Sequence, residues 1–113
     1  MITSYVTPQR SLLYLSLVGA LNEHAADELV NEYYDRQTTT LRQCILDLAA
    51  VESADDIGLT VLHRLSLLAQ VDGIEFSVVA AGSAAEGSIA ISAARYWVEI
   101  IDGLEIPFAR QAS

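Results

Sequence analysis

The stretch CILDLAAVESADDIGLTVL, residues 44–62, has the pattern of a buried strand, a short turn and the start of an apolar helix. Two adjacent carboxylates, Asp55 and Asp56, stand just before Gly58 in the turn. Because neighbouring like charges repel each other, this pair needs a reason. Helix capping, metal ligation, catalysis and a site modified by another protein are the candidates.

Composition predicts one globular domain spanning residues 1–113. Fifteen acidic residues oppose six Arg, Lys is absent, and the formal net charge is −9. Since phosphate binding needs a basic footprint, we expect neither nucleic acid nor an anionic membrane surface as a partner. There is no apolar run long enough to span a membrane and no leader pattern. The lone Cys44 lies in an apolar run, which predicts a buried, inert thiol in the reducing cytoplasm.

The order of apolar patterns predicts an α/β fold in which helical crossovers join parallel strands beside an antiparallel hairpin. The predicted strands are residues 2–6, 11–18, 41–49, 74–81 and 103–110. The predicted helices run from 22 to about 36, from 58 to about 71, and from 83 to about 101. Asn22 is expected to cap the first helix, Gly73 to follow the end of the second, and Ser83 with Glu86 to form a capping box for the third.

Catalytic motifs are absent from the sequence, so we expect no catalytic residue and no enzyme activity. The two imidazoles, His24 and His63, both fall in predicted helices, where solvated side chains are the ordinary interpretation. Cys44 lies in mid-strand without a neighbouring base, which favours packing over nucleophilic attack.

A metal site and a helix cap are the two chemical alternatives for the acidic turn. Asp47, Asp55 and Asp56 are oxygen ligands of the kind that Mg²⁺ uses, which leaves an acidic magnesium-dependent enzyme as the minor hypothesis. No Lys is present to assist phosphoryl chemistry, and the spacing is not that of a calcium loop, so no metal or cofactor is expected. One Asp before a helix is explained as a cap. The second adds repulsion, so the cap alone does not explain Asp56.

The stretch resembles the central signature of STAS domains, the family of bacterial anti-sigma-factor antagonists. That signature is a strand ending L-D-L, a short loop, D-S-S-G or D-S-T-G, and then L-x-V-L. The residues in register are Leu46, Asp47, Leu48, Asp55, Gly58, Leu59, Val61 and Leu62. The earlier segment SLVGALNEHAADEL, residues 16–29, is similar to the family's L-x-G-x-L-D segment at Gly19, Leu21 and Asn22. The resemblance covers residues 11–80 and implies a mixed sheet with helices mainly on one face; it leaves the layout of residues 83–113 open.

The resemblance also implies a partner and a switch. The unmodified antagonist binds an anti-sigma factor, often one with a kinase-like ATP-binding fold, and the partner phosphorylates the first hydroxyl residue after the motif Asp. Here Asp56 occupies that position and Ile57 the next, while Ser53 and Thr60 are hydroxyls out of register. We therefore expect a non-enzymatic regulatory module with a permanently charged switch position. A STAS subunit of a membrane-transport ATPase complex or a signalling scaffold is the alternative.

Helical spacing after the turn separates two faces. The residues expected to face the core are Val61, Leu62, Leu65, Leu68 and Ala69. Those expected on the opposite side are Leu59, Thr60, His63, Leu67 and Val71, with Ile57 at the tip. An apolar patch beside an acidic turn is suited to a protein partner. The predicted docking residues are Ile57, Leu59, Thr60, His63 and Leu67, next to the motif turn of Asp55, Ile57 and Gly58.

Overall fold

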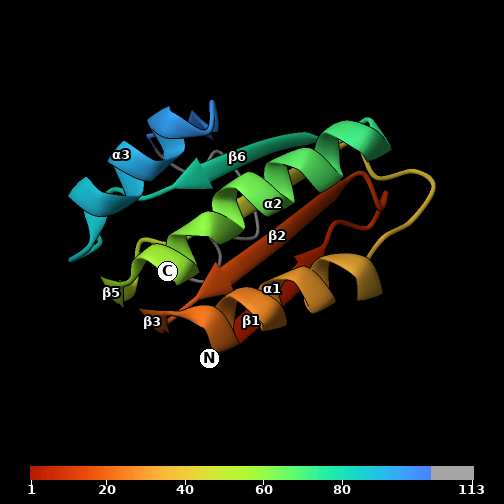
Figure 1. The fold of residues 1–113 in the computed structure, drawn as a ribbon. Coiled ribbons are helices and arrows are strands. Elements are labelled where there is room, and N and C mark those ends of the chain that lie inside the picture. The colour runs from red at the N-terminus through yellow and green to blue at the C-terminus, as the bar shows by residue number, and fades with distance from the viewer. Residues whose placement is uncertain (103–113) are drawn as a thin grey trace.

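Three helices cover one face of a five-stranded sheet in the structure, a computed structural model that describes residues 1–102 (Figure 1). The strand order is β1-β2-β4-β6-β7, with β1 antiparallel to β2 and the other pairs parallel. The strands are β1 (Ile2–Val6), β2 (Leu12–Leu17), β4 (Gln43–Asp47), β6 (Glu75–Val79) and β7 (Glu99–Ile100). The helices are α1 (Glu23–Asp35), α2 (Asp56–Asp72) and α3 (Glu86–Arg95). The α/β class and the mixed sheet predicted from the sequence are confirmed.

The alternation of side chains along β2 shows which face carries the helices. Leu13, Leu15 and Leu17 are buried and join the apolar side chains of the helices in one core. Tyr14, which points to the other face of the sheet, packs instead in a small cluster with Ile45. A period of two is the geometry of a strand, so the pattern that predicted the strand also divides its two faces. Within residues 1–102, no helix combines the length and apolar character needed to cross a bilayer.

Two short strands that were not predicted form a separate parallel pair. They are β3 (Gly19–Leu21) and β5 (Val51–Ala54), which lie beyond the carboxyl ends of β2 and β4 and beside the start of α2 (Figure 1). Gly19 allows the chain to leave β2 because its φ is +105°, a conformation that residues with a side chain rarely adopt. The segment expected to be a loop is thus held by strand pairing before the acidic turn begins.

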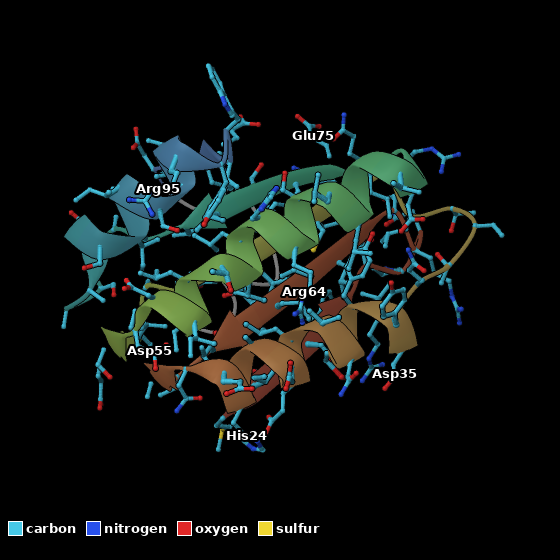
Figure 2. All side chains as sticks on the ribbon, viewed as in Figure 1. His24, Asp35, Asp55, Arg64, Glu75 and Arg95 are labelled. Carbon is cyan, nitrogen blue, oxygen red and sulfur yellow. The ribbon has the colours of Figure 1, made fainter. Side chains whose placement is uncertain are left out.

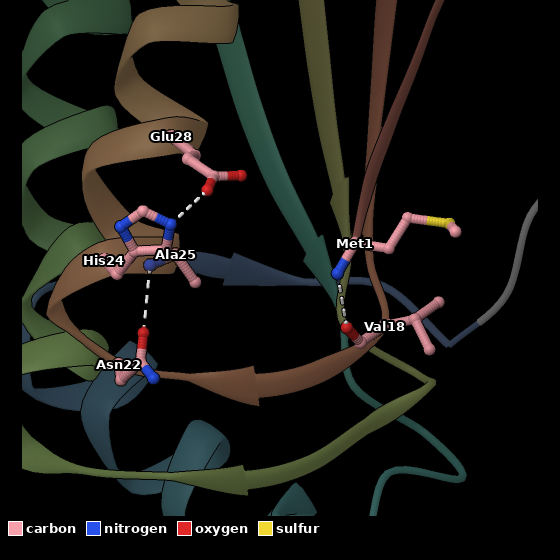
Figure 3. Close-up of polar contacts among 6 residues, drawn as sticks. All are labelled: Met1, Val18, Asn22, His24, Ala25 and Glu28. Carbon is pink, nitrogen blue, oxygen red and sulfur yellow. Dashed lines mark hydrogen bonds and ion pairs between the residues drawn. The ribbon is translucent and has the colours of Figure 1, made fainter.

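Helix α1 begins at the predicted cap. The Asn22 side-chain oxygen accepts a hydrogen bond of 3.0 Å from the backbone N–H three residues later (Figure 3). On the first turn, His24 is exposed and contacts Glu28, as expected for a solvated imidazole (Figure 3). Close to this end of the sheet, the terminal ammonium of Met1 donates a hydrogen bond of 2.9 Å to the carbonyl of Val18.

Helix α3 is shorter than predicted. It ends at Arg95 instead of near residue 101, because Trp97 takes a φ of 59° and Glu99–Ile100 pair with β6 as a strand. The local pattern was compatible with a longer helix, and pairing with the sheet edge decided otherwise. The strand predicted at residues 103–110 lies outside the described residues.

The capping box predicted for α3 is wrong. Its N-cap residue is Ala85, which makes no side-chain capping bond. The Ser83 hydroxyl instead donates to the carbonyl of Val51 at 2.8 Å, and Glu86 accepts from the backbone N–H of Gly82 at 2.9 Å. Ser83 therefore ties the turn before α3 to β5, which is a tertiary contact that the local motif does not encode.

Candidate interaction site

Asp55 is the N-cap of α2. Its carboxylate oxygen accepts a hydrogen bond of 2.6 Å from the backbone N–H of Gly58, and its own backbone N–H donates to the carbonyl of Leu21 at 3.2 Å. The helix begins at Asp56, two residues before the predicted start at Gly58. Asp56 and Ile57 therefore belong to the first helical turn. The capping role expected for Asp55 is confirmed, and β3 positions the cap by accepting its N–H.

The presence of glycine at position 58 is explained by a tertiary contact that the sequence pattern does not indicate. A Cβ at this position would lie 2.1 Å from the carbonyl oxygen of Leu21 and 2.8 Å from the backbone nitrogen of Asn22. A Cβ atom does not come this close to non-bonded backbone atoms in proteins, so α2 can approach the backbone between β3 and α1 only if position 58 has no side chain. Gly58 thus allows α2 to start directly against this junction.

Asp56 and Ile57 point to solvent at the exposed end of α2. Asp56 makes neither an ion pair nor a side-chain hydrogen bond within residues 1–102. Its carboxylate is near the helix N-terminus, where the helix dipole favours negative charge. Ile57 is 58% exposed beside it. The two adjacent carboxylates are therefore chemically distinct: Asp55 caps the helix, whereas the carboxylate of Asp56 is exposed to solvent.

The outer side of α2 follows the predicted division with one exception. Thr60, His63 and Leu67 are exposed, but Leu59 is only 8% exposed and belongs to the core. The placement of Leu59 on the outer face was wrong because α3 packs against that side of the helix. The hydroxyl of Ser92 on α3 donates to the carbonyl of Leu59 at 3.4 Å, which marks the contact.

Two adjoining clefts border the outer side of α2. The first has a volume of about 310 Å³ and lies between α2 and α3, with Asp56 and Thr60 on one wall and Ile91 and Arg95 on the other. Figure 2 shows Arg95 on α3 and Asp55 at the N-terminal end of α2. Tyr96 lines this cleft as well as the second one. Asp56 is thus part of a depression and not an isolated surface charge.

The second cleft has a volume of about 530 Å³ and continues toward the C-terminal half of α2. Its walls include His63 and Leu67 on α2 and Trp97 after α3, with Phe76 of β6 below. The rings of His63 and Tyr96 are stacked, with centroids 4.5 Å apart and planes 4° apart. His63 is therefore exposed as predicted, but it also joins the two helices across the boundary between the clefts.

The three carboxylates of the magnesium hypothesis are not brought together. Asp47 accepts hydrogen bonds from the hydroxyl of Tyr14 and from the backbone N–H of Ala49, while Asp55 is occupied by the helix cap. Burial and then the Asp47 contact raise the pKa of Tyr14 above its ordinary value. Among residues 1–102, no three His, Cys, Asp or Glu side chains are placed to hold a metal ion.

The other residues considered from the sequence are the hydroxyls of Ser53 and Thr60 and the thiol of Cys44. Ser53 is exposed on β5, and the Thr60 hydroxyl donates to the carbonyl of Ile57 at 2.6 Å. Cys44 is fully buried, as predicted, and burial raises the pKa of its thiol to about 12. Sequence reasoning missed the contribution of α3, namely Ile91, Arg95 and Trp97. The spacing of the first two by four residues was the available signal, but without the position of α3 it did not indicate which side of α2 they would meet.

Comparisons with known proteins place this geometry in a family. The family model described as the STAS domain matches residues 5–104, so the chain belongs to the STAS domain family. Its fold is similar to that of solved anti-sigma-factor antagonists. No curated protein sequence matches the chain.

Three solved structures share the fold over nearly their whole length. The anti-sigma factor antagonist SpoIIAA in its unphosphorylated form is 8% identical, with a TM-score of 0.66 over 99% of this chain and 97% of that one. A serine-to-glutamate variant of RsbS from Moorella thermoacetica is 14% identical, with a TM-score of 0.70 over 98% and 94%. An anti-sigma factor antagonist from Mycobacterium paratuberculosis is 20% identical, with a TM-score of 0.65 over 100% and 96%. Identities this low establish the common fold alone.

Proposed function

We propose that this chain is a non-enzymatic regulatory module that acts as an anti-sigma-factor antagonist and carries a fixed negative charge at its switch position. The observation that carries the proposal is the exposed Asp56 on the first turn of α2, without an intramolecular counter-ion among the described residues. Membership of the STAS family and the likeness to antagonists support it. The proposed partner is a cytoplasmic anti-sigma factor with a kinase-like ATP-binding fold.

The switch argument depends on what Asp56 lacks. A carboxylate has no hydroxyl for a Ser/Thr kinase to phosphorylate, yet it places one negative charge where a phosphate would bring nearly two. A partner that met this charge in an interface would have to desolvate it, and only an opposing cation or hydrogen-bond donors would compensate. We therefore infer a partner whose docking surface presents an Arg or Lys to Asp56.

Ile57, Thr60, His63 and Leu67 form the proposed docking residues around this charge, together with the motif turn at Asp55 and Gly58. The side chains of these residues are exposed, so a partner can reach them without rearranging the core; Gly58, which has no side chain, is buried. The side chain of Leu59 is buried in the core, so we propose that Leu59 supports the docking surface from below and does not contact the partner.

Affinity measurements with an anti-sigma factor of kinase-like fold from the same genome test the proposal. Asp56→Ser and Asp56→Asn should each weaken binding by about 1–3 kcal/mol, the scale of a charge-assisted hydrogen bond. Tighter binding of Asp56→Ser would instead show that the partner expects the uncharged form. Equal affinities for all three proteins would reject the switch-position argument.

Two further observations separate the alternatives. Incubation with the partner and labelled ATP should leave the wild-type turn unlabelled, whereas Asp56→Ser restores an acceptor hydroxyl after Asp55. A gene neighbourhood with a membrane permease and its ATPase, in place of a sigma factor and its regulator, would favour the transport-complex alternative. Robust turnover of a substrate that is abolished by Asp56→Ala would reject the non-enzymatic module.

A further inference from the structure

Helix α3 ends in a conformation that is unusual for the residue that adopts it. Trp97 has a φ of 59° and is 93% exposed. Around it, the backbone N–H of Val98 donates to the carbonyl of Ala93 at 2.8 Å, and the N–H of Trp97 donates to that of Ala94 at 3.4 Å. This pair of bonds is the Schellman motif, in which the left-handed residue is usually glycine.

Helix α2 of the same chain ends in the same motif and provides an internal comparison. Ile74 donates to the carbonyl of Ala69 at 2.8 Å, and the left-handed residue between them, which donates to Gln70 at 3.2 Å, is Gly73 with a φ of 70°. The fold therefore uses glycine at this position when nothing else is required. A tryptophan there is strained, because its Cβ crowds the following carbonyl in a left-handed conformation.

Stability does not explain Trp97. At 93% exposure its side chain contributes almost nothing to the core, so it brings backbone strain without the packing that would offset it. Trp97 is instead one of the residues at the second cleft, which Leu67, 49% exposed, also lines. Tryptophan is the residue type most enriched among the side chains that dominate protein–protein binding energy.

The adjoining first cleft adds a requirement for charge. Asp56 on α2 and Arg95 on α3 line its two walls, and neither has a counter-ion within residues 1–102. An occupant that removes both from water must present a cation to Asp56 and an anion to Arg95, because an unpaired charge is costly to desolvate. A purely apolar occupant, such as a lipid tail, does not meet this requirement.

The cleft-lining positions of both helices repeat with helical spacing. On α2 they are Asp56, Leu59, Thr60, His63, Ser66, Leu67 and Gln70; on α3 they are Ser88, Ile91, Ser92 and Arg95. From Asp56 to Gln70 the α2 stripe is about 21 Å long at 1.5 Å per residue. The α3 stripe, from Ser88 to Arg95, is about 10 Å long, and Tyr96 and Trp97 extend that wall along the second cleft. A third helix of about four turns lying along the α2 stripe would match the length of the two clefts together.

We propose that the two clefts together receive one amphipathic helix of a protein partner, anchored on Trp97 and Leu67 at one end and on the charges of Asp56 and Arg95 at the other. This rests on the proposed function and deepens it by naming the element that the partner inserts. The helix carries a basic residue facing Asp56, an acidic residue facing Arg95, and an apolar side chain against Trp97.

The test is to titrate the full chain with an anti-sigma factor of kinase-like fold from the same genome and to compare Trp97→Gly with Val71→Ala. Val71 is the control because it is 85% exposed on α2, the helix that borders both clefts, but lines neither cleft. Trp97→Gly relieves the backbone strain, so its melting temperature should stay the same or rise by a few degrees, on the order of 5 °C. Its affinity should nevertheless fall by about thirtyfold or more, whereas Val71→Ala should change affinity by less than about twofold.

Charge exchange tests the other end of the groove. Arg95→Glu should weaken binding about tenfold or more, and replacing one acidic residue of the partner's inserted helix by Lys should restore it. Unchanged affinity of Trp97→Gly, alongside an effect of the Asp56 variants, would overturn the groove and leave the proposed function standing. A large fall in the melting temperature of Trp97→Gly would show that Trp97 is structural, which also overturns it. No binding by the wild-type chain would reject the proposed function and this inference with it.

Discussion

The α-carbon of Gly58 lies so close to the carbonyl oxygen of Leu21 that a Cβ on Gly58 would be 2.1 Å from that oxygen. The same oxygen accepts the backbone N–H of Asp55 at 3.2 Å. One carbonyl of β3 therefore determines both where the cap of α2 stands and how closely the helix approaches. These two contacts also fix the position of Asp56, because Asp56 lies in the chain between Asp55, which donates to this carbonyl, and Gly58, which packs against it.

Gly58→Ala should strongly destabilise the fold. The added methyl group would have to displace backbone atoms, and overpacking of this kind costs about 1–3 kcal/mol or more of the free energy of unfolding. Urea denaturation measures the change. Gly87→Ala is the control, since a Cβ at Gly87 in α3 meets nothing within 4 Å. It should stabilise by roughly 0.5–1 kcal/mol through better helix propensity. Equal effects of the two substitutions would contradict the close approach to Leu21.

The two adjacent carboxylates should separate by their effect on stability. Asp55→Ala removes the side-chain acceptor for the N–H of Gly58 and should cost about 0.5–2 kcal/mol. Asp56→Ala loses only a favourable position near the helix dipole and should cost about 0.3–1 kcal/mol, less at high salt. Thermal melts of both variants at low and high ionic strength give the comparison. A larger loss for Asp56→Ala would mean that the assignment of cap and switch position must be exchanged.

Leu59 and Leu67 should respond in opposite ways although both were predicted on the outer face. Leu59→Ala removes a side chain that is 8% exposed and should cost about 2–5 kcal/mol of unfolding free energy. Leu67→Arg changes a side chain that is 49% exposed, so stability should stay within about 0.5 kcal/mol while partner affinity falls. Calorimetric melting and binding titration measure the two quantities. A large loss of stability in Leu67→Arg would remove Leu67 from the docking surface.

The thiol of Cys44 should be unreactive in the native chain. Burial raises its pKa to about 12, so at pH 8 the reactive thiolate is scarce and reagents cannot reach the sulfur. A disulfide-exchange dye should give no signal until denaturant is added, and then one thiol per chain. Rapid labelling of the folded protein at pH 8 would show that the strand around Cys44 opens readily.

The elements governed by short-range chemistry were largely predictable. Asn22 as the first cap, Asp55 as the second, and Gly73 at the end of α2 each involve hydrogen bonds within a few residues along the chain. The alternation of apolar residues in the strands and the central signature led to the correct fold class and family. Both the spacing of buried residues and the residues that form turns are set by short stretches of sequence.

The predictions for α3 were less successful because long-range contacts override local preference there. Ser83 has the spacing of a capping box, but its hydroxyl donates to the carbonyl of Val51 on β5 and accepts from the N–H of Ala85, not from that of Glu86. Residues near 99 have a helical pattern, yet they pair with β6 at the sheet edge. In both cases the competing partner is remote in sequence and absent from any local pattern.

The sequence by itself determined the order of the main elements, the caps of α1 and α2, and the charge at position 56. Only the tertiary structure decided which apolar residues of α2 are exposed, because the two sides of the helix are similarly apolar and the position of α3 buries Leu59. It also decided why Gly58 is glycine, since the reason is the carbonyl of Leu21 on another strand. The tertiary structure likewise pairs Asp47 with the hydroxyl of Tyr14, and among residues 1–102 it forms no metal-binding cluster with the acidic turn. Such outcomes depend on which surfaces meet in space, and a local pattern records only what each surface is made of.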